Sequence, residues 1–438
     1  MAHKPSGLQA AKPWTRSRSR PDGYITKLAR WLLDNQIGLS STLIACLLLT
    51  HLGVPSLRPY TSRFFRLSYY NPRTKKYASG FDDFYFMSFW TILLTGLRAG
   101  VIEYILAPLA RRWGVSRRKD ATRFAEQGWM VMYYNVVWPL GMYLYSKSPY
   151  FLNMEELWTE WPQRELDGLV KAYFLGQWSF WVQQILVIHI EDRRKDHWQM
   201  LTHHFVTIAL MAASYAYHQA RVGHLILVLM DVIDLFLPLA KCLKYLGHTT
   251  ICDILFGGFI ISWLIARHLL FLKACWSIYF DSSRIIAPGC YRGTAEALEG
   301  PFPVPSDWSH LIEPFRNPAG TVCWNQNIIY GFLSFLLCLQ VMMLLWFTII
   351  VRIALRIVQG NRAEDLRSEG EEDEQDEKEE EHERAPPLGK EVSENGIGWK
   401  EWEHYVDKGA ATGSGARFPS HRARKELLNR IGCDKHID

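Results

Sequence analysis

Two adjacent histidines and two nearby aspartates are the residues in this sequence whose types and spacing best support chemistry. His203 and His204 lie in one apolar stretch, and Asp231 and Asp234 lie in the next. Ionisable side chains are costly inside a bilayer, so they line cavities or pair with one another. An imidazole can act as a general base or a nucleophile, and a carboxylate can fix its tautomer and stabilise the imidazolium. Acyl transfer from a thioester to an amine requires these functions.

The spacing from the charged ends of the two stretches predicts that the four side chains lie at similar depth. His203 and His204 lie roughly 5 Å inside the helix that follows the basic sequence RRKD, for a rise of about 1.5 Å per residue. Asp234 and Asp231 lie roughly 10 and 15 Å from the same boundary on a helix that returns in the opposite direction. Asp231 and Asp234 share a helix face because they are three residues apart, as do His203 and Thr207, four apart.

Two other interpretations of these residues remain open at this point. The histidines and aspartates can be buried hydrogen-bonding groups that hold two helices together. They can also be metal ligands together with His197. One adjacent pair and scattered single histidines differ from the several short-spaced histidine clusters of membrane di-iron enzymes, so we predict no metal site.

The elements that position these residues are long apolar helices. A membrane span needs about 20 predominantly apolar residues. Eight stretches meet this length approximately: 37–56, 84–108, 127–146, 169–190, 200–217, 222–243, 252–280 and 326–356. The 18 tryptophans, 20 tyrosines and 22 phenylalanines suit helix ends at headgroup level. The predicted fold class is therefore an all-α polytopic membrane bundle of about eight spans.

The lysines and arginines of the short loops predict the orientation. The N-terminal arm, the connection around residues 111–119 and the RRK sequence at 193–195 fall on one side, which we predict to be cytosolic, together with both termini. The acidic segment 155–165 and the long loop 281–325 fall on the other side. The basic loop 57–83 disagrees, because it also falls on the lumenal side. If residues 37–56 did not cross, seven spans would remain and the N-terminus would be lumenal.

The ends of the chain are polar. Residues 1–36 form a predicted cytosolic basic arm without an apolar run or a small-residue cleavage site, so no removable signal peptide is expected. Residues 363–438 begin with a dense acidic run and end with a basic one, which predicts a disordered cytosolic tail. Ser368 precedes several glutamates and is a candidate phosphorylation site there.

The segments around the histidines and aspartates resemble a known family. RRKD, HHFVT and MDVIDLFLPLAK are similar to the signature motif of ceramide synthases, which lies in the six-helix TLC domain. FAEQGWMVMYY and YFLGQWSFWVQQ support the resemblance, which runs from about residue 119 to 362 and is greatest to fungal members. The domain organisation that follows is two N-terminal spans with their loops at 37–118 and a TLC catalytic domain at 119–362.

The resemblance implies a function and its partners. His203 and His204 are implied to be the catalytic pair and Asp231 and Asp234 the paired aspartates. The implied reaction is N-acylation of a sphingoid base (sphinganine or phytosphingosine) by a fatty acyl-CoA in the endoplasmic reticulum membrane, with no bound cofactor and no nucleic acid. A homodimer, a heterodimer with a paralogue, and a small single-pass accessory subunit are further partners that the resemblance suggests. The alternative is a non-enzymatic TLC-domain protein that senses lipid or assists translocation.

Other residues give weaker predictions. Arg193, Arg194 and Lys195 can bind coenzyme phosphates or only determine topology. Arg267, about 22 Å inside its span, can pair with the aspartates or a coenzyme phosphate, and a buried ion pair is favoured. Cys290 and Cys323 share one polar loop and can form a disulfide if that loop is lumenal.

Overall fold

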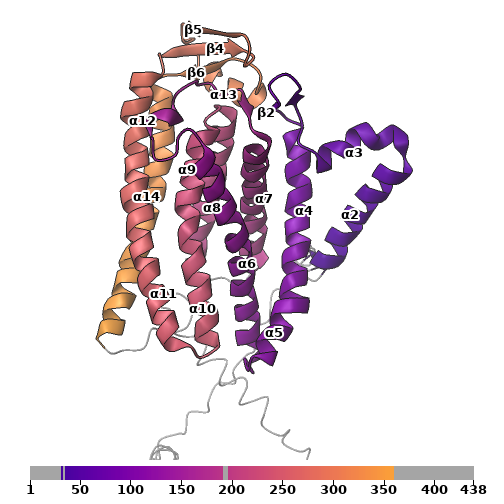
Figure 1. Ribbon diagram of the computed structural model, residues 1–438, viewed down its shortest axis with the longest axis vertical. Helices are drawn as coiled ribbons and strands as arrows, with labels where there is room; N and C mark the ends of the chain where they lie inside the picture. Colours follow the sequence, from indigo (N-terminus) through magenta and orange to yellow (C-terminus); the bar gives the residue numbers. More distant parts are fainter. Residues whose placement is uncertain (1–30, 33–34, 191–195, 360–438) are drawn as a thin grey trace, which may run out of the picture. The chain divides into compact units, whose positions relative to one another are not determined.

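The computed structural model describes residues 31–32, 35–190 and 196–359 (Figure 1). The first helix is α2 (Gln36–Gly53), followed by a 3-10 turn (Pro55–Leu57) and α3 (Arg58–Phe65). Helix α4 (Asp83–Gly100) continues through a π-helical segment (Val101–Leu106) into α5 (Ala107–Arg112). These helices correspond to the two N-terminal spans predicted from the sequence.

Six long helical segments follow, and together they form the predicted six-helix domain. They are α6 (Arg118–Lys147), α7 (Gly168–Ile190), α8 (His197–Ala216), the continuous α9–η4–α10 (Ala220–Asp231, Val232–Leu235, Phe236–Tyr245), α11–η5–α12 (Thr249–Ser262, Trp263–Leu270, Phe271–Ile285) and α14 (Gln326–Val358). Helices form here because backbone groups inside a bilayer must be satisfied within the segment. In Figure 1 these segments stand side by side along one direction.

The membrane character of the fold agrees with the prediction. Within the described ranges, five helical segments are long and apolar enough to cross a membrane: 36–53, 83–112, 220–245, 249–285 and 326–356. The other three expected spans are also helical, in α6, α7 and α8, and they carry more polar side chains, including the two histidines. The chain is an all-α polytopic membrane protein.

A small cap of strands covers one end of the bundle, and the sequence did not predict it. One antiparallel sheet joins β1 (Tyr70–Asn71), β2 (Lys76–Ala78) and β3 (Glu165–Leu166); the other has the order β5-β4-β6, from β4 (Gly289–Gly293), β5 (Leu298–Phe302) and β6 (Val322–Trp324). Helix α13 (Ser309–Arg316) lies beside the second sheet (Figure 1). A disulfide joins the cross-strand pair Cys290 and Cys323.

The basic loop 57–83 lies at the same end of the bundle as this cap. Strand β2 within it pairs with β3, and Arg73 forms a 2.9 Å ion pair with Glu296 of the cap. The buried Lys171 of α7 anchors the loop, since its ammonium lies 2.7 Å from Asp83 and donates to the Ser68 and Ala78 carbonyls. The loop and the cap must therefore lie on the same side of the membrane. These contacts hold the loop on the lumenal side predicted for the cap, despite its positive charge.

Candidate active site

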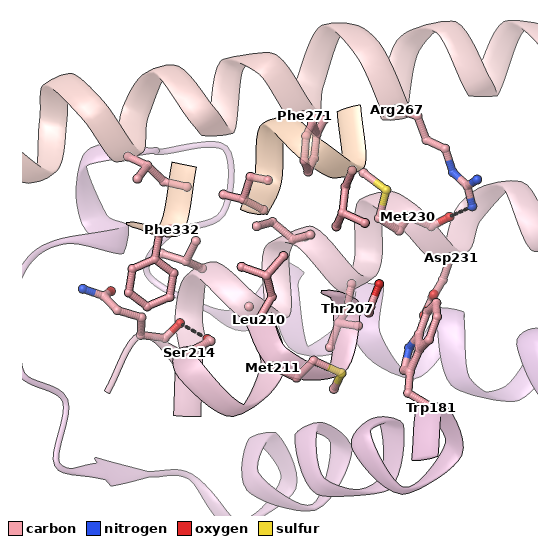
Figure 2. A pocket seen from close by; sticks show the side chains of 18 of the residues that line it. Trp181, Thr207, Leu210, Met211, Ser214, Met230, Asp231, Arg267, Phe271 and Phe332 are labelled. Atoms are coloured by element: carbon pink, nitrogen blue, oxygen red, sulfur yellow. Dashed lines mark hydrogen bonds between the residues drawn. The ribbon is translucent and has the colours of Figure 1, made fainter. Parts of the chain in front are cut away.

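An elongated cavity lies among α8, α9, α12 and α14, and we call it the site cavity. Its polar end is formed by His203, Asp231, Asp234 and Arg267, and the remaining lining is mostly apolar, including Leu210, Met211, Val222, Ile226, Phe271, Phe332, Leu336 and Met343. The lining on α8 runs from His203 to Ser214, which is about 16 Å at 1.5 Å per residue. Figure 2 shows Asp231 and Arg267 at one end and Phe332 at the other. Such a cavity suits an apolar chain with a polar reacting group.

The two histidines have different surroundings, although they are adjacent in the sequence. His203 lines the site cavity, and its ring contacts Trp181 and Trp346 with centroid distances of 5.5 and 5.4 Å. Its buried Nδ1 has no hydrogen-bond partner within the described ranges. His204 is only 6% exposed and does not line the cavity. His203 is therefore the one of the two imidazoles that faces the site cavity.

The tautomer of His204 follows from its hydrogen bond. Its Nδ1 lies 2.7 Å from the Met200 carbonyl oxygen, one turn earlier on α8. A carbonyl only accepts, so Nδ1 carries a proton, and in the neutral ring Nε2 keeps its lone pair. Its ring lies 5.6 Å from that of His203. The sequence interpretation assigned tautomer control to a carboxylate; in the structure, the helix backbone provides it.

The aspartates bind groups other than the imidazoles. Asp231 is 1% exposed and accepts a hydrogen bond from Gln177 of α7. The Gln177 side-chain oxygen in turn accepts a 2.8 Å bond from Tyr133 of α6. Asp234 lies 3.6 Å from the Arg267 guanidinium. Among the described residues, no hydrogen bond joins either aspartate to either histidine.

Arg267 is held on several sides. It donates to the Met230 carbonyl at 3.1 Å (Figure 2), and its guanidinium lies 4.3 Å from the Trp263 ring centroid. It belongs to the π-helical segment η5, a geometry frequent at functional sites. Arg267 forms an ion pair with Asp234. A buried ion pair is what the predicted depth of Arg267 inside its membrane span favoured.

A proline explains the local backbone at Asp234. Pro238 has no N–H, so it cannot bond to the carbonyl four residues earlier, which belongs to Asp234. The helix narrows to the 3-10 turn η4 at Val232–Leu235. Asp231 therefore ends a regular helix, while Asp234 lies in the tighter turn, and both side chains reach the same cavity.

Residues to which the sequence interpretation gave no role complete the polar end, and of these only Thr207 was placed, by its spacing, on the helix face of His203. Trp181 and Thr207 line the site cavity, and Gln177 and Tyr133 lie behind Asp231. Gln177 and Trp181 are four residues apart on α7 and so share a face. The available signal was their membership of YFLGQWSFWVQQ, as Tyr133 belongs to FAEQGWMVMYY.

Some predicted residues lie elsewhere. Arg193, Arg194, Lys195 and Ser368 fall outside the described residues. Cys290 and Cys323 lie in the cap, where Trp324 beside them lines the far end of the site cavity. In the described ranges, no cluster of three or more histidine, cysteine, aspartate or glutamate side chains is arranged to hold a metal ion.

Comparisons with known proteins identify the family. The TLC domain model matches residues 123–352. The chain is 46% identical to "Ceramide Synthase FUM18" of Gibberella moniliformis, over 90% of this chain and 89% of that protein. It is 37% identical to "Sphingosine N-acyltransferase lag1" of Schizosaccharomyces pombe, over 85% and 90%, and 29% identical to "Ceramide synthase LAG1" of Saccharomyces cerevisiae, over 71% and 70%. The chain belongs to the TLC-domain family of ceramide synthases, or sphingosine N-acyltransferases.

Proposed function

We propose that this protein is a ceramide synthase that transfers a long- or very-long-chain fatty acyl group from coenzyme A to the amine of a sphingoid base, either sphinganine or phytosphingosine. One observation carries this proposal: His203 faces the polar end of a cavity whose remaining lining is almost entirely apolar. An acyl chain along the apolar length places its thioester carbonyl beside an imidazole.

The reaction needs a base and a route for one proton. The amine nitrogen attacks the thioester carbon, the carbon–sulfur bond breaks, and the amine proton passes to an imidazole and then to the thiolate. His203 is the histidine placed to contact the substrate, and His204 offers a neutral Nε2 behind it. Asp231 and Asp234 supply negative charge that stabilises an imidazolium or the incoming ammonium.

A second route is open within the same site. His203 or His204 can itself be acylated by the donor and then pass the acyl group to the amine. Incubating the protein with acyl-CoA alone and mapping adducts by mass spectrometry distinguishes the two. An acyl group on either histidine supports the two-step route, whereas single-turnover reactions without an adduct support direct attack.

The proposal places the substrates relative to the membrane. Coenzyme A is large and anionic, and the sequence provides Arg193, Arg194 and Lys195 just before α8, at the end nearer His203. The sphingoid base reaches the cavity from the bilayer. We place the protein in the endoplasmic reticulum membrane with both termini cytosolic, as a homodimer or a heterodimer with a paralogue, and with a small single-pass accessory subunit.

An assay on purified protein in lipid tests the function. Sphinganine and phytosphingosine are offered with a series of acyl-CoA donors of increasing length, and ceramides are measured by mass spectrometry. We expect ceramide from the parent and from His248→Ala, which alters an exposed turn between α10 and α11. His203→Ala, His204→Ala and Asp231→Ala should lose it while remaining folded. A folded parent that forms no ceramide with any donor contradicts the proposal.

A further inference from the structure

Thr207 has a hydroxyl group that its helix does not use. It lies one turn after His203 on α8 and lines the site cavity. Thr42, Thr95 and Thr202 donate to the carbonyl four residues earlier at 2.7, 2.7 and 2.8 Å. The buried Thr207 hydroxyl makes no such bond and has no partner in the described part of the chain. Leaving a buried donor unpaired is destabilising, so its position points to a partner supplied from the cavity.

Trp181 presents a second such donor. Its indole N–H can only donate, yet the nitrogen is buried without a partner among the described residues. Other indoles of the bundle are satisfied: Trp138 and Trp158 donate to the Val228 carbonyl and the Ser277 hydroxyl, at 3.1 and 2.9 Å. Of the unpaired buried indoles in the described ranges, Trp181 alone makes ring contacts with both catalytic histidines, at 5.5 Å from His203 and 5.0 Å from His204.

The two donors face one end of one cavity. Trp181 and Thr207 come from α7 and α8, and Figure 2 shows both side chains near Asp231, at the end where Arg267 lies. Arg267 also has an unused donor at this end, because Nη2 makes both of its bonds, to Asp234 and to the Met230 carbonyl, and its buried Nε has no partner in the described part of the chain. Of these donors, Trp181 contacts the His203 ring and Thr207 lies one turn after His203 on α8, so the indole N–H and the hydroxyl are the two beside His203.

We propose that the Trp181 indole N–H and the Thr207 hydroxyl form the oxyanion hole of this enzyme. This assignment rests on the acyl transfer proposed above. When the amine or an imidazole attacks the carbonyl carbon, the C=O π pair moves to the carbonyl oxygen, which becomes an anion. The pair returns when the C=O bond re-forms and the carbon–sulfur bond breaks, so the thiolate leaves with its electron pair. Fixed donors aimed at that oxygen lower the barrier, because they need no reorganisation during the reaction.

Two substitutions remove the donors; Thr207→Val conserves the side-chain shape, whereas Trp181→Phe also shortens the ring system. Trp181→Phe deletes the indole N–H, and Thr207→Val replaces the hydroxyl with a methyl group. Removing one oxyanion donor lowers kcat by about 10²–10³-fold in known enzymes. We expect a fall of about 10²-fold in kcat for each variant, with the KM for both substrates changed little. Trp178→Phe and Thr202→Val are matched controls on the same helices, since neither residue lines the cavity, and they should retain the parent kcat.

A ligand without a carbonyl separates catalysis from packing. An S-alkyl coenzyme A thioether has the hydrocarbon chain and the coenzyme but lacks the carbonyl oxygen that the proposed oxyanion hole would bind. Its affinity should be the same for the parent and both variants, measured on protein whose thermal unfolding matches the parent. Three results would each overturn the assignment. They are a variant kcat within twofold of the parent value, a thioether affinity that falls in the variants together with kcat, and variants in which only the KM for the sphingoid base rises. A folded parent without activity overturns the proposed function and this assignment with it, whereas an active parent with unaffected variants overturns only the assignment.

Discussion

At the scale of single residues, the site has a polar network behind its carboxylates. Tyr133 donates to Gln177, and Gln177 donates to Asp231, so three helices (α6, α7 and α9) fix one carboxylate. Each member is buried, with Tyr133 9% and Gln177 2% exposed. A buried chain of this kind restricts Asp231 to one rotamer, because every alternative leaves a polar atom unpaired.

Removing the first hydroxyl of this network tests its role. Tyr133→Phe leaves the Gln177 oxygen without its donor, which should lower the free energy of unfolding by about 1–3 kcal/mol. We also expect a roughly tenfold lower kcat, because Asp231 is held less firmly. Tyr143→Phe, an exposed tyrosine of the same helix, is the control. Thermal unfolding and initial rates that do not distinguish the two variants would contradict a positioning role for Tyr133.

Residue type decided how much of the site could be predicted. His203, Asp231 and Arg267 were predictable because charge-bearing side chains are rare and costly in apolar stretches. Trp181 was not, and Thr207 was predicted only to share the helix face of His203, because tryptophan and threonine are ordinary in membrane helices and their importance depends on which atoms lack partners. The separation of His203 from His204 also required coordinates, since adjacent residues on a helix point in different directions.

At the scale of elements, the cap depends on one buried arginine. Arg164 donates to His218 Nε2 at 2.9 Å and to the carbonyls of Tyr291, Pro318 and Gly320. It therefore joins the segment before β3, the turn after α8 and the cap loop. Arg164 can only donate to His218 Nε2, whereas the Pro318 carbonyl, 3.1 Å from the same nitrogen, can only accept, and the adjacent guanidinium charge favours the neutral ring that accepts from Arg164. Burial, together with the positive charge of Arg164, lowers the pKa of His218 to about 3.

This histidine predicts a loss of stability in mild acid. Its pKa in an unfolded chain is about 6.5, so between that pH and about 3 the unfolded state binds a proton that the folded state does not. The free energy of unfolding should therefore fall as pH decreases through this window, by up to about 1.4 kcal/mol per pH unit.

A substitution isolates this contribution from other titrating groups. His218 has a φ of 56°, which asparagine tolerates, so His218→Asn keeps the turn without a titratable ring. The difference in Tm between pH 7.5 and pH 5 should be smaller for His218→Asn than for the parent. Equal differences would show that His218 does not titrate as its surroundings require.

The disulfide of the cap gives a separate prediction about stability. Cys290 and Cys323 are 33 residues apart, and closing such a loop stabilises a fold by about 3–4 kcal/mol. The double variant Cys290→Ser/Cys323→Ser should unfold at lower temperature and become insensitive to reducing agent, unlike the parent. The double variant Cys46→Ser/Cys338→Ser, which alters two exposed free thiols, is the control. A parent whose Tm does not respond to reductant would contradict the prediction.

The strands of the cap could not be predicted from the sequence pattern. Its strands are two to five residues long, too short for an alternating pattern to be recognised. The long helices were predictable because each needs about 20 apolar residues. Their interruptions at η4 and η5 were not, because a 3-10 or π-helical turn changes the apolar composition of a segment very little.

At the scale of the whole molecule, the open question in the sequence was whether residues 37–56 cross the membrane. Helix α2 covers most of this stretch and is long and apolar enough to do so. Its one buried residue is Ser40, which packs against Gly96 of α4. Its remaining surface suits contact with lipid. Helix α4, which follows α3 and the basic loop, leads away from the end of the bundle that carries the cap (Figure 1).

Labelling of single cysteines in sealed microsomes tests the eight-span topology. In a background without reactive cysteines, a membrane-impermeant maleimide should label Asn35→Cys, before α2, and Thr250→Cys, near the turn between α10 and α11. It should not label Arg66→Cys or Thr294→Cys, which lie at the cap end, until detergent is added. Protection of Asn35→Cys would favour seven spans with a lumenal N-terminus.

The central claim is that His203, at the polar end of the site cavity, carries acyl transfer from coenzyme A to a sphingoid base. The most direct measurement is ceramide formation by purified parent and His203→Ala proteins in lipid, with unfolding temperatures recorded on the same samples. We predict ceramide from the parent and at least a 10²-fold lower rate from His203→Ala at an unchanged unfolding temperature. Equal rates in the two folded proteins, or no ceramide from the parent, would contradict the account.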